Sequence, residues 1–214
     1  MSESLTVLAG HSGYSVPRNT RGMRTTQQLL EAGRRLLRRR FLDEVSIQEI
    51  CASANVTTGA FYKRFDGKEA YFKALQTLLI AKLREATTAR MAELDARPWT
   101  LREVTEVLAR NLRLWVCRNE GVLRASLVER ASTHDPIRAV NLEYVEQLVP
   151  RLAKMHPRGP SPELESVIRF AYQSMIGTLV FTLINRTGSY ALTDRRLEQA
   201  MAKQFYLFVT QGLD

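Results

Sequence analysis

The sequence predicts an all-α fold of about nine helices. Apolar residues recur at helical spacing in successive segments, for example at Ile47, Ile50 and Ala54. Capping pairs of the Ser/Thr-x-x-Glu type stand at the start of two such segments, at residues 46–49 and 100–103. These two observations define most of the chain as amphipathic helices joined by short loops.

The N-terminal segment, residues 1–22, is rich in Ser, Gly and Thr, and we expect it to be a mostly disordered arm. The first long helix is expected after this arm, with Thr25 or Thr26 as its N-cap and Phe41 closing its apolar stripe. The basic cluster between residues 34 and 40 covers the rest of this helix, and such a run is usually a solvated face.

The stretch from Ser46 to Lys68 reads as two very short helices around a tight turn. Ser46 caps the first helix, and Asn55 ends it because Asn enters the left-handed backbone region at low cost. Thr57 caps the second helix. The inward face of this second helix is formed by Ala60, Phe61 and Phe65, and its other side carries Thr58, Gly59, Tyr62, Lys63 and Arg64.

Two short helices around such a turn are typical of a helix-turn-helix, which places its second helix in the DNA major groove. Small residues in the first turn of that helix permit close approach, and the Tyr, Lys and Arg that follow can donate to phosphates or bases. The alternative is an ordinary helical hairpin with a solvated outer face. If the segment is a helix-turn-helix, the N-terminal arm has two possible roles. It either reaches the duplex through Arg18, Arg21 and Arg24 or leaves these arginines in solvent.

The remaining elements follow from the apolar pattern and its interruptions. The expected helices are a long one from Lys68 to about Ala96, one from Thr100 to about Arg118, a shorter one from about Val122 to Ala131 after a break at Gly121, one over residues 137–155 with a kink at Pro150, one opened by Ser161 and Pro162, and a last one capped by Thr193 or Asp194. The helix after Pro162 is apolar on nearly all faces around residues 175–184, so we expect it to be buried on all sides. An apolar pair of terminal helices also indicates an interface.

The segment TTGAFYKRFDGKEAYFKAL (57–75) resembles the signature of TetR-family transcriptional repressors. IQEICASANVTTGAFYKRF (47–65) is similar to the helix-turn-helix of that family, and TTQQLLEAGRRLLRRRFLDEVS (25–46) to its first helix. The resemblance covers about residues 23–83. It departs from the family at Asn55, where Gly is usual and where Asn suits the same backbone geometry.

The resemblance implies a three-helix DNA-binding domain at residues 23–83 and a helical effector-binding and dimerisation domain at residues 84–214. It implies a homodimer, paired through the last two helices, that binds a pseudo-palindromic double-stranded operator. The residues expected at base edges are Thr58, Gly59 and Lys63, those expected at phosphates are Ser46, Thr57, Tyr62 and Lys68, and Arg64 is expected beside them. A small-molecule effector is expected between the helices of the second domain, where the candidate lining residues are Trp115, Tyr144, Phe170, Gln173 and Met175; the alternative is that they are core.

Composition bounds the remaining functional classes. The net charge is +9, and residues 1–73 supply +5 of it from 12 basic and 7 acidic side chains, which suits a DNA-binding N-terminal region, although charge alone would also fit an acidic membrane surface. Cys51 and Cys117 are expected to be buried reduced thiols of a cytoplasmic protein, and we expect no metal and no cofactor. No apolar run approaches the roughly 20 residues that span a bilayer, and no signal peptide is evident, so we expect no membrane partner.

The expected function is therefore a ligand-responsive repressor of transcription. One alternative is a DNA-binding or adaptor protein on the same fold that senses no ligand. The other is an all-helical enzyme, which we do not favour because the sequence contains no G-x-S-x-G, G-x-x-x-x-G-K-[ST] or H-E-x-x-H motif.

Overall fold

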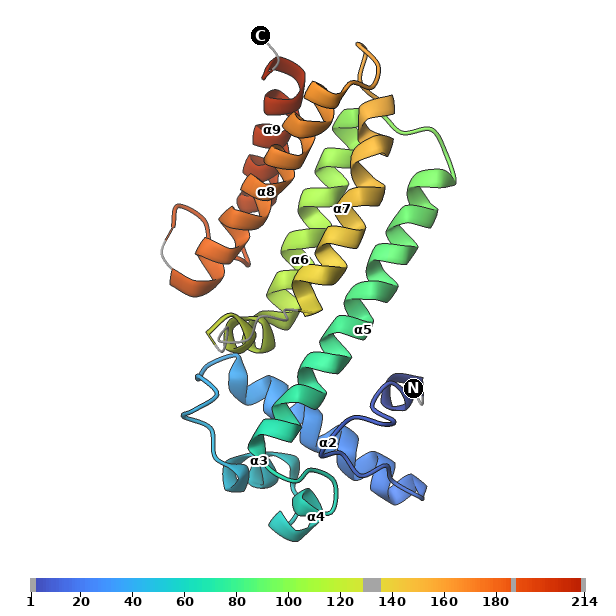
Figure 1. The fold of residues 1–214 in the computed structure, drawn as a ribbon. Helices are drawn as coiled ribbons and strands as arrows, with labels where there is room; N and C mark the ends of the chain where they lie inside the picture. The colour runs from blue at the N-terminus through green and yellow to red at the C-terminus, as the bar shows by residue number, and fades with distance from the viewer. Residues whose placement is uncertain (1–2, 129–135, 186–187, 213–214) are drawn as a thin grey trace. The chain divides into compact units, whose positions relative to one another are not determined.

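The computed structural model describes residues 3–128, 136–185 and 188–212 of the 214-residue chain. This part of the chain is all-helical, as predicted, and its only strand-like pairing is an isolated bridge between Tyr14 and Phe65. The helices drawn in Figure 1 are α1 (Glu3–Thr6), α2 (Thr20–Leu37), α3 (Ile47–Ala54), α4 (Thr58–Tyr62), α5 (Lys68–Asp95), α6 (Leu101–Val128), α7 (Pro136–Lys154), α8 (Pro162–Asn185) and α9 (Arg195–Gln211).

The chain forms two compact units that are not consecutive in sequence. Unit 1 holds Met1–Glu85 and a second stretch that begins at Asn119, whereas unit 2 holds Ala86–Arg118 and the chain from Pro136 onward. Helices α5 and α6 therefore each belong partly to one unit and partly to the other. The predicted boundary after residue 83 lies close to the end of the first stretch, but a division at a single point misses the α6 segment that packs in unit 1.

The N-terminal segment differs from the expected disordered arm, because it packs against unit 1. We call residues 5–19 the N-terminal strap. Leu8 is fully buried and Tyr14 is almost so. The backbone pairs with the end of α4: the Ser15 amide donates to the Arg64 carbonyl at 2.8 Å, and the Asp66 amide donates to the Gly13 carbonyl at 3.0 Å. The polar composition of this segment predicted that the entropy cost of ordering its backbone would keep it disordered. The buried apolar side chains and the backbone pairing together offset that cost.

Helix α2 begins earlier than the sequence predicted. Its N-cap is Asn19, whose side chain accepts from the Gly22 amide at 2.8 Å, so Thr25 and Thr26 lie inside the helix. The arginines near its end are not simply solvated. Arg35 donates to the Ser53 carbonyl at 2.7 Å near the end of α3, where the last carbonyls lack intrahelical partners.

Helix α6 is continuous through Gly121, where a break was predicted. Gly121 lies against the backbone at the end of α2: a Cβ atom at this position would stand 2.5 Å from the Leu37 carbonyl carbon and 2.7 Å from the Arg38 nitrogen. The glycine therefore permits a close helix-to-backbone approach within unit 1. The end predicted for the shorter helix, at Ala131, lies outside the described residues.

Unit 2 is built from the first part of α6, the end of α5, and α7, α8 and α9. A buried ion pair holds α6 to α9: Arg113 Nε donates to Glu198 Oε2 at 2.8 Å, and Arg113 Nη1 donates to the Leu192 carbonyl at 2.9 Å. Both charged groups are thus paired and hydrogen-bonded, which is the condition under which burial is tolerated. Helix α9 is capped by Asp194, one of the two predicted residues.

Helix α8 departs from the expectation that it is buried on all sides. Ile168, Met175 and Leu179 are buried on its inner face. Its outer face leaves Phe170 and Phe181 about half exposed. Contrary to the expectation from sequence, an 18-residue window of α8 is apolar enough, at a mean hydropathy of 1.5, to cross a bilayer. The core helix of a folded protein passes the same test, so this feature alone assigns no membrane role.

Candidate nucleic-acid interface

The first helix of the predicted helix-turn-helix, α3, has the caps that the sequence indicated. The Ser46 hydroxyl accepts from the Glu49 amide at 3.2 Å, and the Glu49 carboxylate accepts from the Ser46 amide at 2.8 Å, which forms a complete capping box. Asn55 ends the helix with φ 53° and ψ 49°, in the left-handed region. The structure confirms both caps. They could be predicted because each depends only on residues close in sequence.

Helix α4 is short, and its two faces have different environments. Thr57 caps it by accepting from the Ala60 amide at 3.2 Å, and Phe61 is fully buried on its inner face. Its outer face is exposed, with Tyr62 58% accessible. The residues of this outer face and its cap are Thr57, Thr58, Gly59, Tyr62 and Lys63. Among the described residues, no side-chain hydrogen bond or ion pair occupies Tyr62 or Lys63, so their donors face solvent.

A buried aromatic cluster holds α4 in place. The ring centroids of Phe61 and Phe65 lie 5.4 Å apart, and each also contacts Tyr71 of α5, at 5.4 Å and 5.1 Å. The Tyr71 hydroxyl donates to the Leu29 carbonyl of α2 at 2.6 Å, and burial raises the pKa of this phenol. Gly33 of α2 gives the ring room, since a Cβ there would stand 1.9 Å from the Tyr71 hydroxyl oxygen. A five-residue helix, too short to be stable alone, is thereby fixed by packing.

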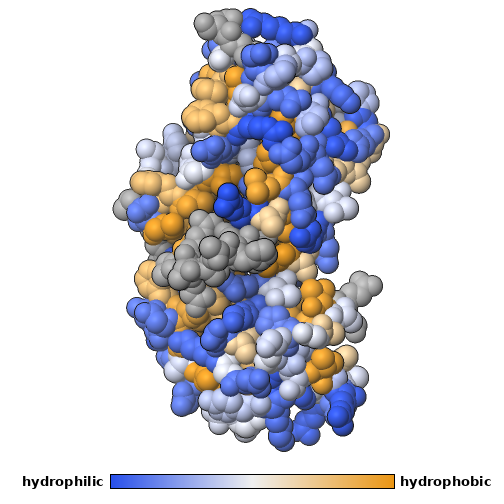
Figure 2. Space-filling model, viewed as in Figure 1, coloured by the Kyte–Doolittle hydropathy of each residue, from blue (hydrophilic) through white to orange (hydrophobic). Residues whose placement is uncertain are grey.

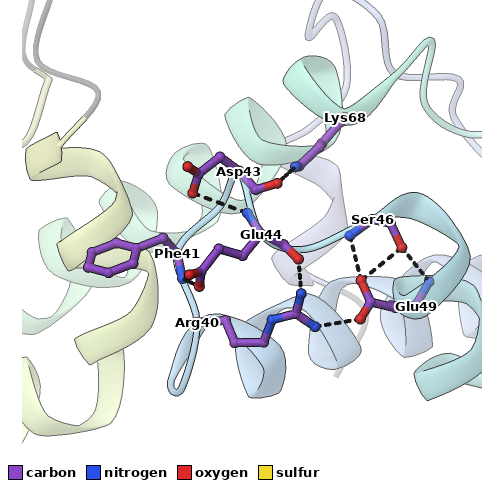
Figure 3. Close-up of polar contacts among 7 residues, drawn as sticks. All are labelled: Arg40, Phe41, Asp43, Glu44, Ser46, Glu49 and Lys68. Carbon is purple, nitrogen blue, oxygen red and sulfur yellow. Dashed lines mark hydrogen bonds and ion pairs between the residues drawn. The ribbon is translucent and has the colours of Figure 1, made fainter.

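A polar network surrounds the start of α3, as Figure 3 shows. Arg40 donates to the Glu49 carboxylate and to the Glu44 carbonyl. The Ser46 backbone bond, followed by the Arg40 bond, lowers the pKa of Glu49 to about 2. The Glu44 carboxylate in turn accepts from the Phe41 amide at 2.8 Å. The network fixes the loop between α2 and α3, which determines how α3 and α4 are presented.

Two of the predicted phosphate-binding residues belong to this network. The Ser46 hydroxyl both accepts from Glu49 and donates to its carboxylate at 2.8 Å. Lys68, at the start of α5, donates to the Asp43 carbonyl at 3.2 Å (Figure 3). An ammonium group has three donors, so Lys68 keeps two for a phosphate, while the hydroxyl proton of Ser46 is already engaged.

Arg64 lies apart from the other predicted DNA-binding residues. Its guanidinium packs on the first turn of α2, where a Cβ at Gly22 would stand 2.4 Å from Arg64 Nη2, and its Nε is buried without a partner among the described residues. Its carbonyl receives the strap bond from Ser15. The structure therefore groups Arg64 with the strap and α2, while Tyr62 and Lys63 point outward.

The sequence reasoning missed Arg124, a residue of α6 that is part of unit 1. This buried guanidinium donates to the Leu37 carbonyl at 2.8 Å and to the Arg40 carbonyl at 3.3 Å, and it lies over the Phe41 ring. It thus satisfies carbonyls that the end of α2 leaves without intrahelical partners. Its ion pair with Glu120 at 3.4 Å is local, but the two carbonyls lie more than 80 residues away in sequence, so no local signal could have found these bonds.

The five candidate effector-lining residues are spread over unit 2. Tyr144 and Met175 are buried, Trp115 is half-buried, and Phe170 and Gln173 are exposed on α8. The Tyr144 ring packs near the Tyr172 ring at 6.1 Å, and burial raises its pKa to about 12. The structure brings Tyr144 and Met175 into the interior and leaves Phe170 against Phe208 of α9, at 5.4 Å between ring centroids.

Metal and thiol chemistry have little support in the part of the chain that the structure describes. No group of three His, Cys, Asp or Glu side chains is placed there to hold a metal ion. Cys51 is buried, and burial raises the pKa of its thiol; Cys117 is only half-buried, which differs from the expectation that both are buried.

Comparison with known proteins agrees with this geometry. A family model described as bacterial regulatory proteins, tetR family, matches residues 29–75, which run from α2 into α5. Among solved structures, a TetR-family transcriptional regulator candidate from Mesorhizobium loti MAFF303099 has a TM-score of 0.59 at 16% sequence identity, over 89% of this chain and 98% of that chain. A TetR transcriptional regulator from Rhodococcus sp. RHA1 has a TM-score of 0.46 at 15% identity, over 86% and 97%. No curated protein matches.

At 16% identity the structural likeness shows the shared fold, whereas the family match rests on the helix-turn-helix residues themselves. The structural match extends over 89% of the chain, whereas the family match is confined to residues 29–75. The family match over residues 29–75 and the shared fold together support a TetR-family regulator.

Proposed function

We propose that this regulator is a dimeric, ligand-responsive repressor that binds a pseudo-palindromic operator in the cytoplasm. The observation that carries the proposal is the outer face of α4, which exposes small residues in its first turn and unengaged donors beyond it. Thr58, Gly59 and Lys63 are assigned to base edges in the major groove, with Gly59 permitting close approach of the backbone. Thr57, Tyr62 and Lys68 are assigned to phosphates.

The homodimer is proposed to pair through α8 and α9. In Figure 2, apolar side chains gather over these helices. The exposed apolar residues there are Phe170, Phe181, Ile184, Leu207 and Phe208. A face of this kind is common where a partner covers it, and a second copy of the chain supplies a matching face. Replacing Phe181 with Asp is expected to give monomers in sedimentation; unchanged dimers would contradict this assignment.

The effector is proposed to be a small molecule that binds in unit 2. Support comes from the buried Tyr144 and Met175 and from the polar pair beside them, in which the Tyr172 hydroxyl donates to Asn141 Oδ1 at 2.8 Å. Phe170 and Gln173 are exposed on the outer face of α8, so we do not assign them to the lining of the effector site. An effector can weaken operator binding only to the extent that its affinity for the conformation that does not bind DNA exceeds its affinity for the conformation that does.

Selection from a random-sequence duplex library tests the proposal. The expected result is enrichment of one site with two-fold symmetric half-sites about one helical turn or more apart. Binding without any enriched sequence would instead indicate a sequence-tolerant DNA-binding protein. Absence of duplex binding would contradict the assignment of α4 altogether.

A further inference from the structure

The strap and the start of α2 carry three arginines that the family match does not cover. Arg18, Arg21 and Arg24 all precede residue 29, where the match begins. All three are exposed, and within the described residues none of them forms an ion pair or a side-chain hydrogen bond. We call these residues the arginine row.

The arginine row is held in a fixed place by the folded strap. Asn19 caps α2 directly after Arg18. Gly13 lies against α5, where a Cβ would stand 2.6 Å from the Ala70 Cβ. The backbone pairing of Gly13 and Ser15 with Asp66 and Arg64 then ties the strap to the end of α4. The arginines therefore project from ordered backbone on both sides of the cap.

The same contacts bring the row close to the DNA-reading helix. Arg64, two residues beyond Tyr62, packs its guanidinium on Gly22, which stands between Arg21 and Arg24. In Figure 1 the N-terminal end of α2 and the helix α4 both lie at the lower end of unit 1. The arginine row thus borders the surface that exposes Tyr62 and Lys63.

Helix stability does not explain these positions. The first turn of α2 contains no acidic residue, and cations near a helix N-terminus oppose the helix dipole. Arg21 therefore stands in the first turn, where its charge is unfavourable for the isolated helix, and among the described residues neither Arg21 nor Arg24 forms an ion pair with a carboxylate. A polyanion bound at α4 would supply the missing counter-charge.

We propose that Arg18, Arg21 and Arg24 bind the phosphate backbone that flanks the half-site read by α4. This inference rests on the proposed DNA-binding function and extends its interface beyond the helix-turn-helix. The salt slope follows the number of phosphates that cations neutralise, so Lys, which keeps the charge of Arg, is expected to preserve that slope at these positions.

The test is a salt titration of binding to a fluorescent 30-base-pair duplex of random sequence, which needs no operator. The variant carries Arg18→Gln, Arg21→Gln and Arg24→Gln. The control variant removes the same charge from exposed positions of unit 2, through Arg110→Gln, Arg118→Gln and Lys154→Gln. The rescue variant carries Arg18→Lys, Arg21→Lys and Arg24→Lys. Circular dichroism and melting curves verify that all variants are folded.

The slope of log K against log salt is expected to become shallower by about 0.9 for each lost phosphate contact, or about 2.7 for three contacts in one subunit. The control and rescue variants are expected to keep the wild-type slope. An unchanged slope in the Gln variant, or an equal change in the control, overturns the inference while leaving the proposed function in place. A wild-type protein that binds no duplex overturns both.

Discussion

Two groups of polar side chains in unit 1 look alike in the sequence and differ in the structure. Thr58, Tyr62 and Lys63 on the outer face of α4 are exposed and not engaged by other described residues. Around the start of α3, by contrast, Arg40 and the Ser46–Glu49 capping box bond to one another. We call them the free group and the engaged group. The difference separates donors that remain available to an external partner from donors that the fold already uses.

The largest effect on stability is expected from a substitution where α6 packs against the end of α2, next to the engaged group. Gly121→Ala would place a Cβ 2.5 Å from the Leu37 carbonyl carbon, a backbone atom that cannot rotate away as the end of a flexible side chain can. We expect a loss of about 1–3 kcal/mol in the free energy of unfolding, measured by urea titration. Gly67→Ala is the control, because a Cβ there meets nothing within 4 Å. Equal stability of the two variants would show that α6 does not press on α2.

Removing the cap of α3 is expected to have a smaller effect. Ser46→Ala leaves the Glu49 amide without its acceptor, which costs about 1 kcal/mol of stability for a typical N-cap. The same variant, once folded, is expected to bind duplex DNA within twofold of wild type. Thr58→Ala is the matched control, expected to lower duplex affinity and leave the urea midpoint unchanged. A large loss of duplex affinity in Ser46→Ala would indicate that the Ser46 side chain contacts DNA, as proposed for the free group.

The engaged group also predicts a pH dependence. The pKa of Glu49 is lowered to about 2 by the Ser46 and Arg40 bonds, from an ordinary value of 4.5. A carboxyl whose pKa is lower in the folded state stabilises the fold above its unfolded pKa, and this contribution is lost as the pH falls from about 4.5 to about 2. The stability difference between wild type and Glu49→Gln should therefore shrink over that range. A difference independent of pH would contradict the network.

Substitutions in the free group are expected to change DNA binding and to have the smallest effect on stability. Lys63→Gln removes an exposed charge, so the melting temperature is expected to stay within about 1 °C of wild type, as for most surface substitutions. The salt slope of duplex binding is expected to become shallower by about 0.9. Arg110→Gln in unit 2 is the control and should leave that slope unchanged.

The features that sequence predicts well are those set by near neighbours. The Ser46 capping box, the left-handed Asn55 and the Thr57 cap each depend on residues within four positions, and all three occur as predicted. The inward Phe61 follows from helical periodicity. The outer face of α4 is the remainder of that pattern, which is why its exposed residues were predictable.

The features that sequence missed depend on distant partners. Gly121 reads as a break because a glycine that permits close approach looks the same as one that ends a helix. Arg64 reads like Lys63, and only its contact with Gly22 distinguishes them. The strap reads as disordered because Leu8 and Tyr14 are few among polar residues, although both are buried.

The central claim is that the outer face of α4 contacts DNA, and photo-crosslinking from position 62 tests it most directly. Benzoylphenylalanine in place of Tyr62, a side chain that is 58% exposed, is irradiated with duplex DNA, and the same group in place of Leu142, which is 50% exposed in unit 2, serves as the control. A protein–DNA crosslink is expected from position 62 and none from position 142. Equal crosslinking from both positions, or none from position 62 while the protein is bound to DNA, would contradict the claim.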